Sequence, residues 1–173
     1  MIVAGTMLVG LAAAAPVAAQ NEGDLEKVRE AVAVMTEQDP GIQEWFNTSH
    51  AYAVFPNVGK AGFGIGGAHG NGIAYVGNAP IGKTELSAVT IGLQAGVQSF
   101  VEVVFFKDQV AWDYFTRGNF EFGAQVSAVA LTAGVSADMA YNNGVAVVTM
   151  AKGGLMYEAS VGGQKFKYEA YGN

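Results

Sequence analysis

The hydrophobic and polar positions of this chain follow two different periods, one before residue 50 and one after it. Over residues 24–38, apolar residues recur three or four positions apart, which predicts an amphipathic helix with Asp24 at its N-cap. The apolar stripe of this helix consists of Leu25, Val28, Val32 and Met35. A second, short helix is expected over residues 42–47, with Trp45 and Phe46 packed against the domain.

Beyond these helices the apolar positions alternate with a period of two, which predicts strands. A short strand over residues 52–55 is expected to end at Pro56-Asn57. Two further strands, over residues 62–68 and 72–76, are expected around a turn at Gly70-Asn71-Gly72. The remaining strands are expected over residues 87–98, 100–106, 120–128, 145–150, 155–161 and 165–168, with a short helix over 108–116.

These elements predict an α+β fold, in which N-terminal helices pack on a strongly curved, mostly antiparallel, glycine-rich, barrel-like β-sheet. The chain has 173 residues, enough for one domain, and its 24 glycines suit sharply curved strands and close backbone approaches. We divide it into a signal peptide (1–19), an N-terminal helical segment (20–50) and a β-rich domain (51–173).

The signal peptide is predicted because the first twenty residues are almost wholly apolar and carry no charged side chain. The apolar stretch ends at Pro16, and Val17-Ala18-Ala19 places small or compact residues where signal peptidase cleaves. We therefore expect a periplasmic or secreted protein; a retained membrane anchor is the alternative interpretation. The chain has no cysteine, which excludes disulfides, thiolate metal sites and lipoprotein processing.

The net charge of −6 changes which partners can be expected. It argues against broad electrostatic binding to nucleic acid and against a polybasic membrane anchor. The first predicted helix favours packing on the sheet over lying on a membrane, because its polar face is too acidic: Glu26, Lys27, Arg29, Glu30 and Glu37. Contact with an anionic group must come from local lysines or from backbone N–H groups.

Two glycine motifs resemble nucleotide-binding loops. Residues 77–84, GNAPIGKT, match the P-loop pattern letter for letter, with a predicted strand before them. A P-loop must open a helix, whereas the segment that follows alternates with period two and contains Gly92 and Gly96. The GxGxxG pattern at residues 62–67 is followed by more glycines rather than by a helix. We expect strands at both places, with Asp108 as a helix cap rather than a Mg²⁺ ligand.

The ionisable residues form no readable catalytic constellation. His50 and His69, the two histidines, lack partners at metal-ligand spacing, so we expect no metal, no cofactor and no enzymatic activity. Glu102 lies in an apolar strand, where we expect it on the exposed face or paired with a lysine. A carboxyl group with a perturbed pKa is the alternative for Glu102.

Four separated blocks resemble the SYLF family of lipid-binding domains. The first is residues 51–72, AYAVFPNVGKAGFGIGGAHGNG, and the others are residues 91–99, 120–124 and 151–163. The resemblance implies the exported bacterial branch of the family, with proposed phospholipid binding and no established enzymatic activity. Eukaryotic members bind phosphoinositides and, in some cases, actin filaments.

The chain departs from the family pattern in two places. Residues 80–87, PIGKTELS, replace the Trp-Ser-x-Pro element that often follows the first block. The basic amphipathic N-terminal helix of the phosphoinositide-binding members is absent. Both departures weaken the carry-over of phosphoinositide and actin binding.

A head-group site is therefore expected where glycines and lysines meet, since glycine-rich turns expose N–H groups that can form an anion-binding nest. The candidate lipid-binding residues are Lys60, Gly62, Phe63, Gly64, Lys83, Lys152, Lys165 and Lys167. The expected partner is an anionic phospholipid or a membrane surface. The second hypothesis is a structural envelope protein that binds a protein partner at a sheet edge, and the third is a nucleotide hydrolase. For each residue, the alternative is that lysines only keep the surface soluble and glycines only bend strands.

Overall fold

The computed structural model describes residues 17–118, 120–122, 127–153 and 163–172, and gives the backbone alone for residues 17–20, 63–64 and 90–97. The described helices are α1 (Val17–Gln38), α2 (Ile42–Thr48), α3 (Gln109–Thr116) and the 3-10 turn η1 (Val135–Asp138). The described strands are β1 (Ala51–Val76), β2 (Ala79–Phe106), β3 (Phe120–Glu121), β4 (Ala128–Ala130), β5 (Val145–Lys152) and β6 (Gln164–Ala170). The predicted α+β class is confirmed, whereas the strand expected over residues 155–161 and residues 1–16 of the expected signal peptide lie outside the described residues.

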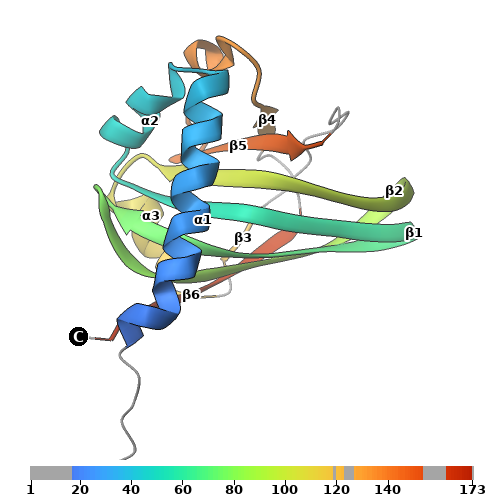
Figure 1. Cartoon of the computed structure of the whole chain (residues 1–173), viewed down its shortest axis with the longest axis horizontal. Helices are drawn as coiled ribbons and strands as arrows, with labels where there is room; N and C mark the ends of the chain where they lie inside the picture. The colour runs from blue at the N-terminus through green and yellow to red at the C-terminus, as the bar shows by residue number, and fades with distance from the viewer. Residues whose placement is uncertain (1–16, 119, 123–126, 154–162, 173) are drawn as a thin grey trace, which may run out of the picture.

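One long antiparallel ribbon, β1 with β2, organises the sheet (Figure 1). Gly77-Asn78 forms the turn between the two strands, and Gly77 adopts a φ of +57° there. β5 pairs with one half of β2, over residues 99–106, and β6 pairs with the other half, over residues 82–88. β3 continues the sheet beyond β6 and β4 beyond β5; among the pairs that the structure describes, β4–β5 is parallel and the others are antiparallel.

The ribbon folds back on itself between Gly62 and Gly66. A Cβ atom placed on Gly62 would collide with the Cα of Gly66, and one on Gly72 would lie 2.5 Å from the carbonyl oxygen of Val54. The two halves of β1 therefore lie against each other. The strongly curved sheet that the glycine content predicts is confirmed, and glycine is required where the curved chain meets itself.

Two predicted strand ends are wrong for the same physical reason. Gly70-Asn71-Gly72 is no turn, because all three residues lie within β1 and the two glycines face its first half at close range. Pro56-Asn57 does not end a strand either. It marks a shift of register between Phe55 and Val58, beyond which β1 continues. Glycine and proline here mark irregularities of a continuous curved strand.

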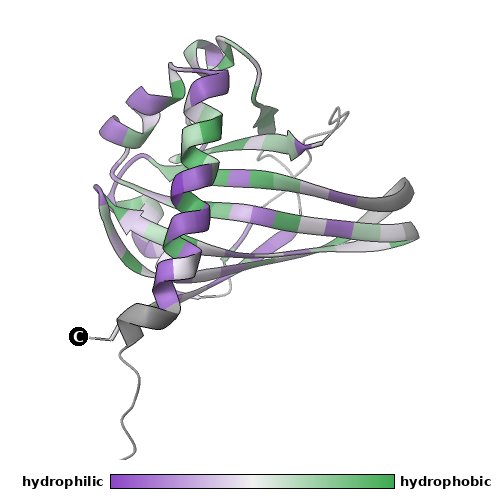
Figure 2. Cartoon of the chain, in the orientation of Figure 1, coloured by the Kyte–Doolittle hydropathy of each residue, from purple (hydrophilic) through white to green (hydrophobic). Residues whose placement is uncertain are grey.

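The sheet separates two apolar clusters. Hydrophobic and hydrophilic residues alternate along its strands in Figure 2, as the period of two requires. The inner cluster fills the curl of the sheet beneath α3 and includes Phe55, Phe106, Phe115, Phe122 and Phe166. The outer cluster lies beneath α1 and α2 and includes Val28, Met35, Ile42, Phe46 and Phe105. The predicted packing of the N-terminal helices on the sheet is confirmed.

The beginning of α1 differs from the prediction. The helix starts at Val17, so Asp24 lies inside it and forms an ion pair with Lys27 at 3.3 Å instead of an N-cap. Alanine is the strongest helix former, and Ala18 and Ala19 extend the helix toward the N-terminus. Within the described residues, no helix is both long enough and apolar enough to cross a membrane.

Replacement of Gly72 with alanine should destabilise the fold by about 1–3 kcal/mol, since the new methyl group would overlap the Val54 carbonyl oxygen. Gly23→Ala is the matched control: no heavy atom lies within 4 Å of its Cβ position in α1, and alanine there should stabilise by up to about 1 kcal/mol. Urea unfolding followed by circular dichroism measures both changes. Equal effects of the two substitutions would contradict the close approach of the β1 halves.

Candidate functional site

The segment that matches the P-loop pattern forms no phosphate-binding loop. Gly77-Asn78 is the β1–β2 turn, and residues 79–84 are the first part of β2. Gly82 and Lys83 pair with β6, so the chain continues as a strand where a P-loop would begin a helix. Asp108 caps α3 by accepting a hydrogen bond from the Ala111 N–H at 3.0 Å. Both predictions are confirmed.

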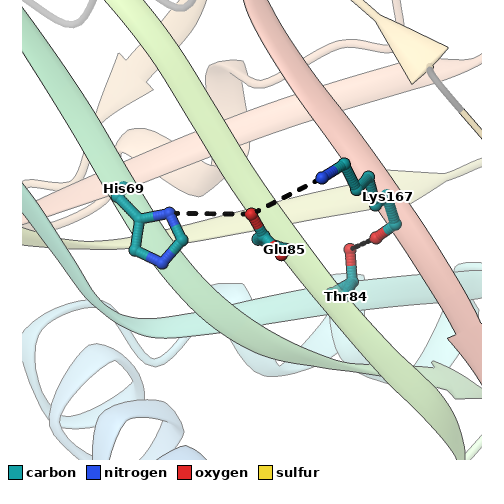
Figure 3. Close-up of polar contacts among 4 residues, drawn as sticks. All are labelled: His69, Thr84, Glu85 and Lys167. Atoms are coloured by element: carbon teal, nitrogen blue, oxygen red, sulfur yellow. Dashed lines mark hydrogen bonds and ion pairs between the residues drawn. The ribbon is translucent and has the colours of Figure 1, made fainter.

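The outer face of β1, β2 and β6 carries ionisable side chains in register, which we call the outer band (Figure 3). Directly paired residues of antiparallel strands share one face of a sheet. The rows across β1, β2 and β6 are His69–Ser87–Lys165, Asn71–Glu85–Lys167 and Ile73–Lys83–Glu169. The Glu85 carboxylate lies at the centre, 3.9 Å from Nδ1 of His69 and 4.0 Å from Nζ of Lys167. Beside it, the buried Thr84 hydroxyl donates to the Lys167 carbonyl oxygen at 2.9 Å and ties β2 to β6.

A cleft of about 730 Å³ lies between the N-terminal part of α1 and the outer band. Its charged lining residues are three lysines and three carboxylates, namely Lys27, Lys83, Lys167, Asp24, Glu85 and Glu169. Asn57, Asn71 and Ile73 contribute the neighbouring wall. The cleft can therefore offer ammonium groups to a phosphate without carrying a net positive charge.

The structure divides the predicted lysines between two places. Lys83 and Lys167 line the cleft together, although they are far apart in sequence. Lys60 and Lys152 lie toward the far end of the ribbon, opposite Gln98 and Ser99 of β2. Lys165 lies between these groups on β6, with its ammonium group 3.6 Å from the Glu121 carboxylate.

The predicted glycine and aromatic residues lie at the fold-back of the ribbon. Gly62 pairs with Gly96, and the Phe63 backbone pairs with Ala95. Gly64 lies at the shift of register between Phe63 and Ile65. The side chain of Phe63 lies outside the described part of the chain. The fold-back is thus close to Lys60 and remote in sequence from the cleft lysines.

A buried carboxyl group differs from the prediction. The Glu102 side chain is fully buried on the inner face, and Nε2 of Gln164 donates to its Oε2 at 3.0 Å. Burial raises the pKa of Glu102 to about 8, and the hydrogen bond from Gln164 offsets part of that rise. The expectation of an exposed or lysine-paired Glu102 is wrong, and the alternative of a perturbed carboxyl group is confirmed. The signal was available, because Phe100 and Val104 at i−2 and i+2 face the same interior.

The histidines lie in different surroundings. His69 is exposed in the outer band, whereas the carbonyl oxygen of His50 accepts a hydrogen bond from the Gly77 N–H at 3.4 Å, near the start of β1. In the part of the chain that the structure describes, no three His, Asp or Glu side chains are placed to hold a metal ion together.

Comparison with known proteins gives two similarities. The sequence model of the Ysc84 family, described as "Las17-binding protein actin regulator", matches residues 87–173, which is half of the chain. "Beta cell expansion factor A" of Aeromonas veronii is 27% identical over 132 residues, covering 75% of this chain and 49% of that protein. The chain therefore spans about half the length of this curated relative.

Proposed function

Since the chain belongs to the SYLF family, represented by the Ysc84 sequence model, we propose that it is a non-catalytic phospholipid-binding module of the bacterial periplasm or envelope. The observation that carries this proposal is the cleft between α1 and the outer band, where Lys27, Lys83 and Lys167 converge from three separate elements. Three ammonium groups around one cavity suit a phosphate, which accepts charge-assisted hydrogen bonds. The resemblance to the exported bacterial branch supports the proposed location.

The carboxylates of the cleft shape the kind of binding that we propose. Glu85 lies within ion-pair distance of Lys167, so a phosphate would compete with Glu85 for that ammonium group. Asp24 and Glu169 can accept hydrogen bonds from an ammonium group of a lipid head group. With three charges of each sign in the cleft and −6 on the whole chain, binding should depend on local geometry more than on long-range attraction.

Vesicle co-sedimentation of the full chain tests the proposal. The vesicles contain phosphatidylglycerol and phosphatidylethanolamine in equal amounts. We expect the double variant Lys83→Glu/Lys167→Glu to bind on the order of thirtyfold more weakly or worse, because each lysine near an anionic surface contributes about 1 kcal/mol. The control is Lys107→Glu/Arg117→Glu, two exposed positions on either side of α3, which changes the net charge by the same amount.

Three outcomes decide this proposal. Binding that weakens in the double variant and not in the control supports the cleft as the phosphate site. Equal weakening in both variants shows an effect of net charge and removes the cleft. Absence of binding of the unmodified chain to vesicles of any natural phospholipid mixture removes the proposed function.

A protein partner is the second candidate function. It is favoured by exposed apolar side chains on α3, where Val110 is 78% and Tyr114 is 60% exposed beside a second cavity of about 670 Å³. Affinity capture from envelope extracts, with Val110→Asp/Tyr114→Asp as the control bait, tests this candidate. A protein captured without lipid by the unmodified chain and lost with the control bait would favour it. Actin is not included, because residues 80–87 depart from the family pattern and this departure weakens the carry-over of actin binding.

A further inference from the structure

We propose that the far end of the β1–β2 ribbon enters the apolar layer of a phospholipid bilayer, with Ile65 and Val89 as inserted side chains. We call this end the ribbon tip: residues 61–68 of β1 and 88–97 of β2. In Figure 1 the tip extends past β3 and β5, on the side away from α2 and α3. The inference rests on the proposed phospholipid binding and names the part of the molecule that would enter the membrane.

Exposed apolar side chains are the first observation. Ile65 is 71% exposed and Val89 is 72% exposed. The register pairs Ile65 with Ile91 and Gly67 with Val89, so Ile65 and Val89 are diagonal neighbours on the outer face. Transfer of these two neighbouring apolar side chains from water into an apolar phase would be favourable.

The charge pattern along the ribbon is the second observation. No Asp, Glu, Lys or Arg lies between Lys60 and Lys83 or between Glu85 and Glu102. Sheet ends that stay in water are commonly protected by charged side chains, lysine above all. A charged side chain is costly to carry into the bilayer, and this stretch of the ribbon carries no Asp, Glu, Lys or Arg.

The third observation is the basic side chains at the base of the tip: Lys60, His69, Lys152 and Lys165. His69 and Lys165 flank Ser87 in one row of the outer band, two residues from Val89. Lys152 lies opposite Ser99, at the other half of the ribbon. Lysines can keep their ammonium groups at the phosphates while their stems pass along apolar surface. Two described carboxylates lie beside this group: that of Glu121 is 3.6 Å from the Lys165 ammonium group, and that of Glu85 is 3.9 Å from Nδ1 of His69.

Strand geometry gives the depth to which the ribbon tip can enter the bilayer. A strand rises about 3.3 Å per residue, so Ile65 reaches at most about 13 Å beyond His69. The head-group region of one leaflet is about 5–8 Å thick. With His69 and Lys165 at the level of the phosphates, Ile65 reaches the hydrocarbon. On either side of the register shift between Phe63 and Ile65, the pairing of β1 with β2 satisfies N–H and C=O groups between the two strands.

A fluorescent label at the tip tests the inference directly. The chain has no cysteine, so Ile65→Cys can be labelled with an environment-sensitive fluorophore such as NBD. Vesicles of phosphatidylglycerol and phosphatidylethanolamine should shift the emission of the label to shorter wavelength, and lipids with spin-labelled acyl chains should quench it. Val110→Cys is the matched control, since Val110 is 78% exposed on α3, and its label should keep the emission seen in water.

A substitution gives the second measurement. Ile65→Ser/Val89→Ser should lower vesicle binding on the order of a hundredfold or more, because the variant removes two apolar side chains from the hydrocarbon layer. The control Val34→Ser/Val110→Ser changes exposed valines on α1 and α3 and should leave binding unchanged. Both altered positions of the tip are exposed, so circular dichroism should show an intact fold.

The outcomes separate this inference from the function on which it rests. If the chain binds vesicles while the label at residue 65 keeps the emission seen in water, the insertion is overturned and phospholipid binding remains. No vesicle binding removes both. A label that shifts without vesicles, in proportion to protein concentration, shows that the tip pairs with a second copy of the chain and overturns the insertion.

Discussion

The free energy of unfolding is expected to fall by several kcal/mol as the pH rises from about 5 to about 9, because the buried Glu102 must lose its proton. Burial raises the pKa of this carboxyl group from 4.5 to about 8. Between these values the unfolded chain releases the proton and the folded chain keeps it. The stability of the neutral form is thus fully present below about pH 4.5 and is lost up to about pH 8, at most on the order of 4–5 kcal/mol.

Glu102→Gln tests this origin of the pH dependence. Glutamine keeps the shape of the side chain and cannot ionise, so the variant should unfold at nearly constant urea concentration across this pH range. The control is Glu121→Gln, which removes a carboxylate that is 51% exposed beside Lys165. Burial raises the pKa of Tyr75 to about 12, so this phenol titrates above the range tested. The same slope in both variants would contradict the role of Glu102.

The alternation of apolar residues was enough to predict strands, and too local to predict where each strand ends. Gly70 and Gly72 follow the composition of a turn, yet they lie within β1 because they face its first half at close range. A sequence pattern reports that a side chain must be absent at a position. It does not report whether the space is needed for a turn or for another part of the chain. For the same reason, Pro56 resembles the end of a strand in the sequence, although β1 continues beyond it after a shift of register.

In the candidate site, too, single residues could be predicted from the local sequence, whereas contacts between distant residues could not. The lysines could be selected from the sequence because they lie beside glycines or at or near the ends of predicted strands. Their grouping could not, since Lys83 meets Lys167 only through the pairing of β2 with β6. Glu102 shows the opposite error. The period of two places Glu102 on the same face as Phe100 and Val104, which is buried, whereas the usual exposure of glutamate predicts the opposite.

Asp39→Ala is expected to lower the free energy of unfolding by about 2–4 kcal/mol, because two N–H groups would lose their acceptor. Asp39 is 2% exposed and lies between α1 and α2. Its carboxylate accepts a hydrogen bond from the Ser136 N–H at 2.8 Å and another from the Gly41 N–H at 3.1 Å. It therefore fixes the α1–α2 connection to η1, far away in the sequence. Urea unfolding at neutral pH measures the loss.

The pH dependence of this contribution has the opposite sign to that of Glu102. The hydrogen bond from the Ser136 N–H holds the pKa of Asp39 below 3.8, so its stabilisation is present above that pH and is lost as the pH falls further. The control is Asp138→Ala, an exposed carboxylate on the same η1 turn, which should change stability little. Equal losses in the two variants would contradict the proposed bridge. Protonation of Asp39 lowers the free energy of unfolding at lower pH, and ionisation of Glu102 lowers it at higher pH. The two groups together therefore predict greatest stability at about pH 4–5.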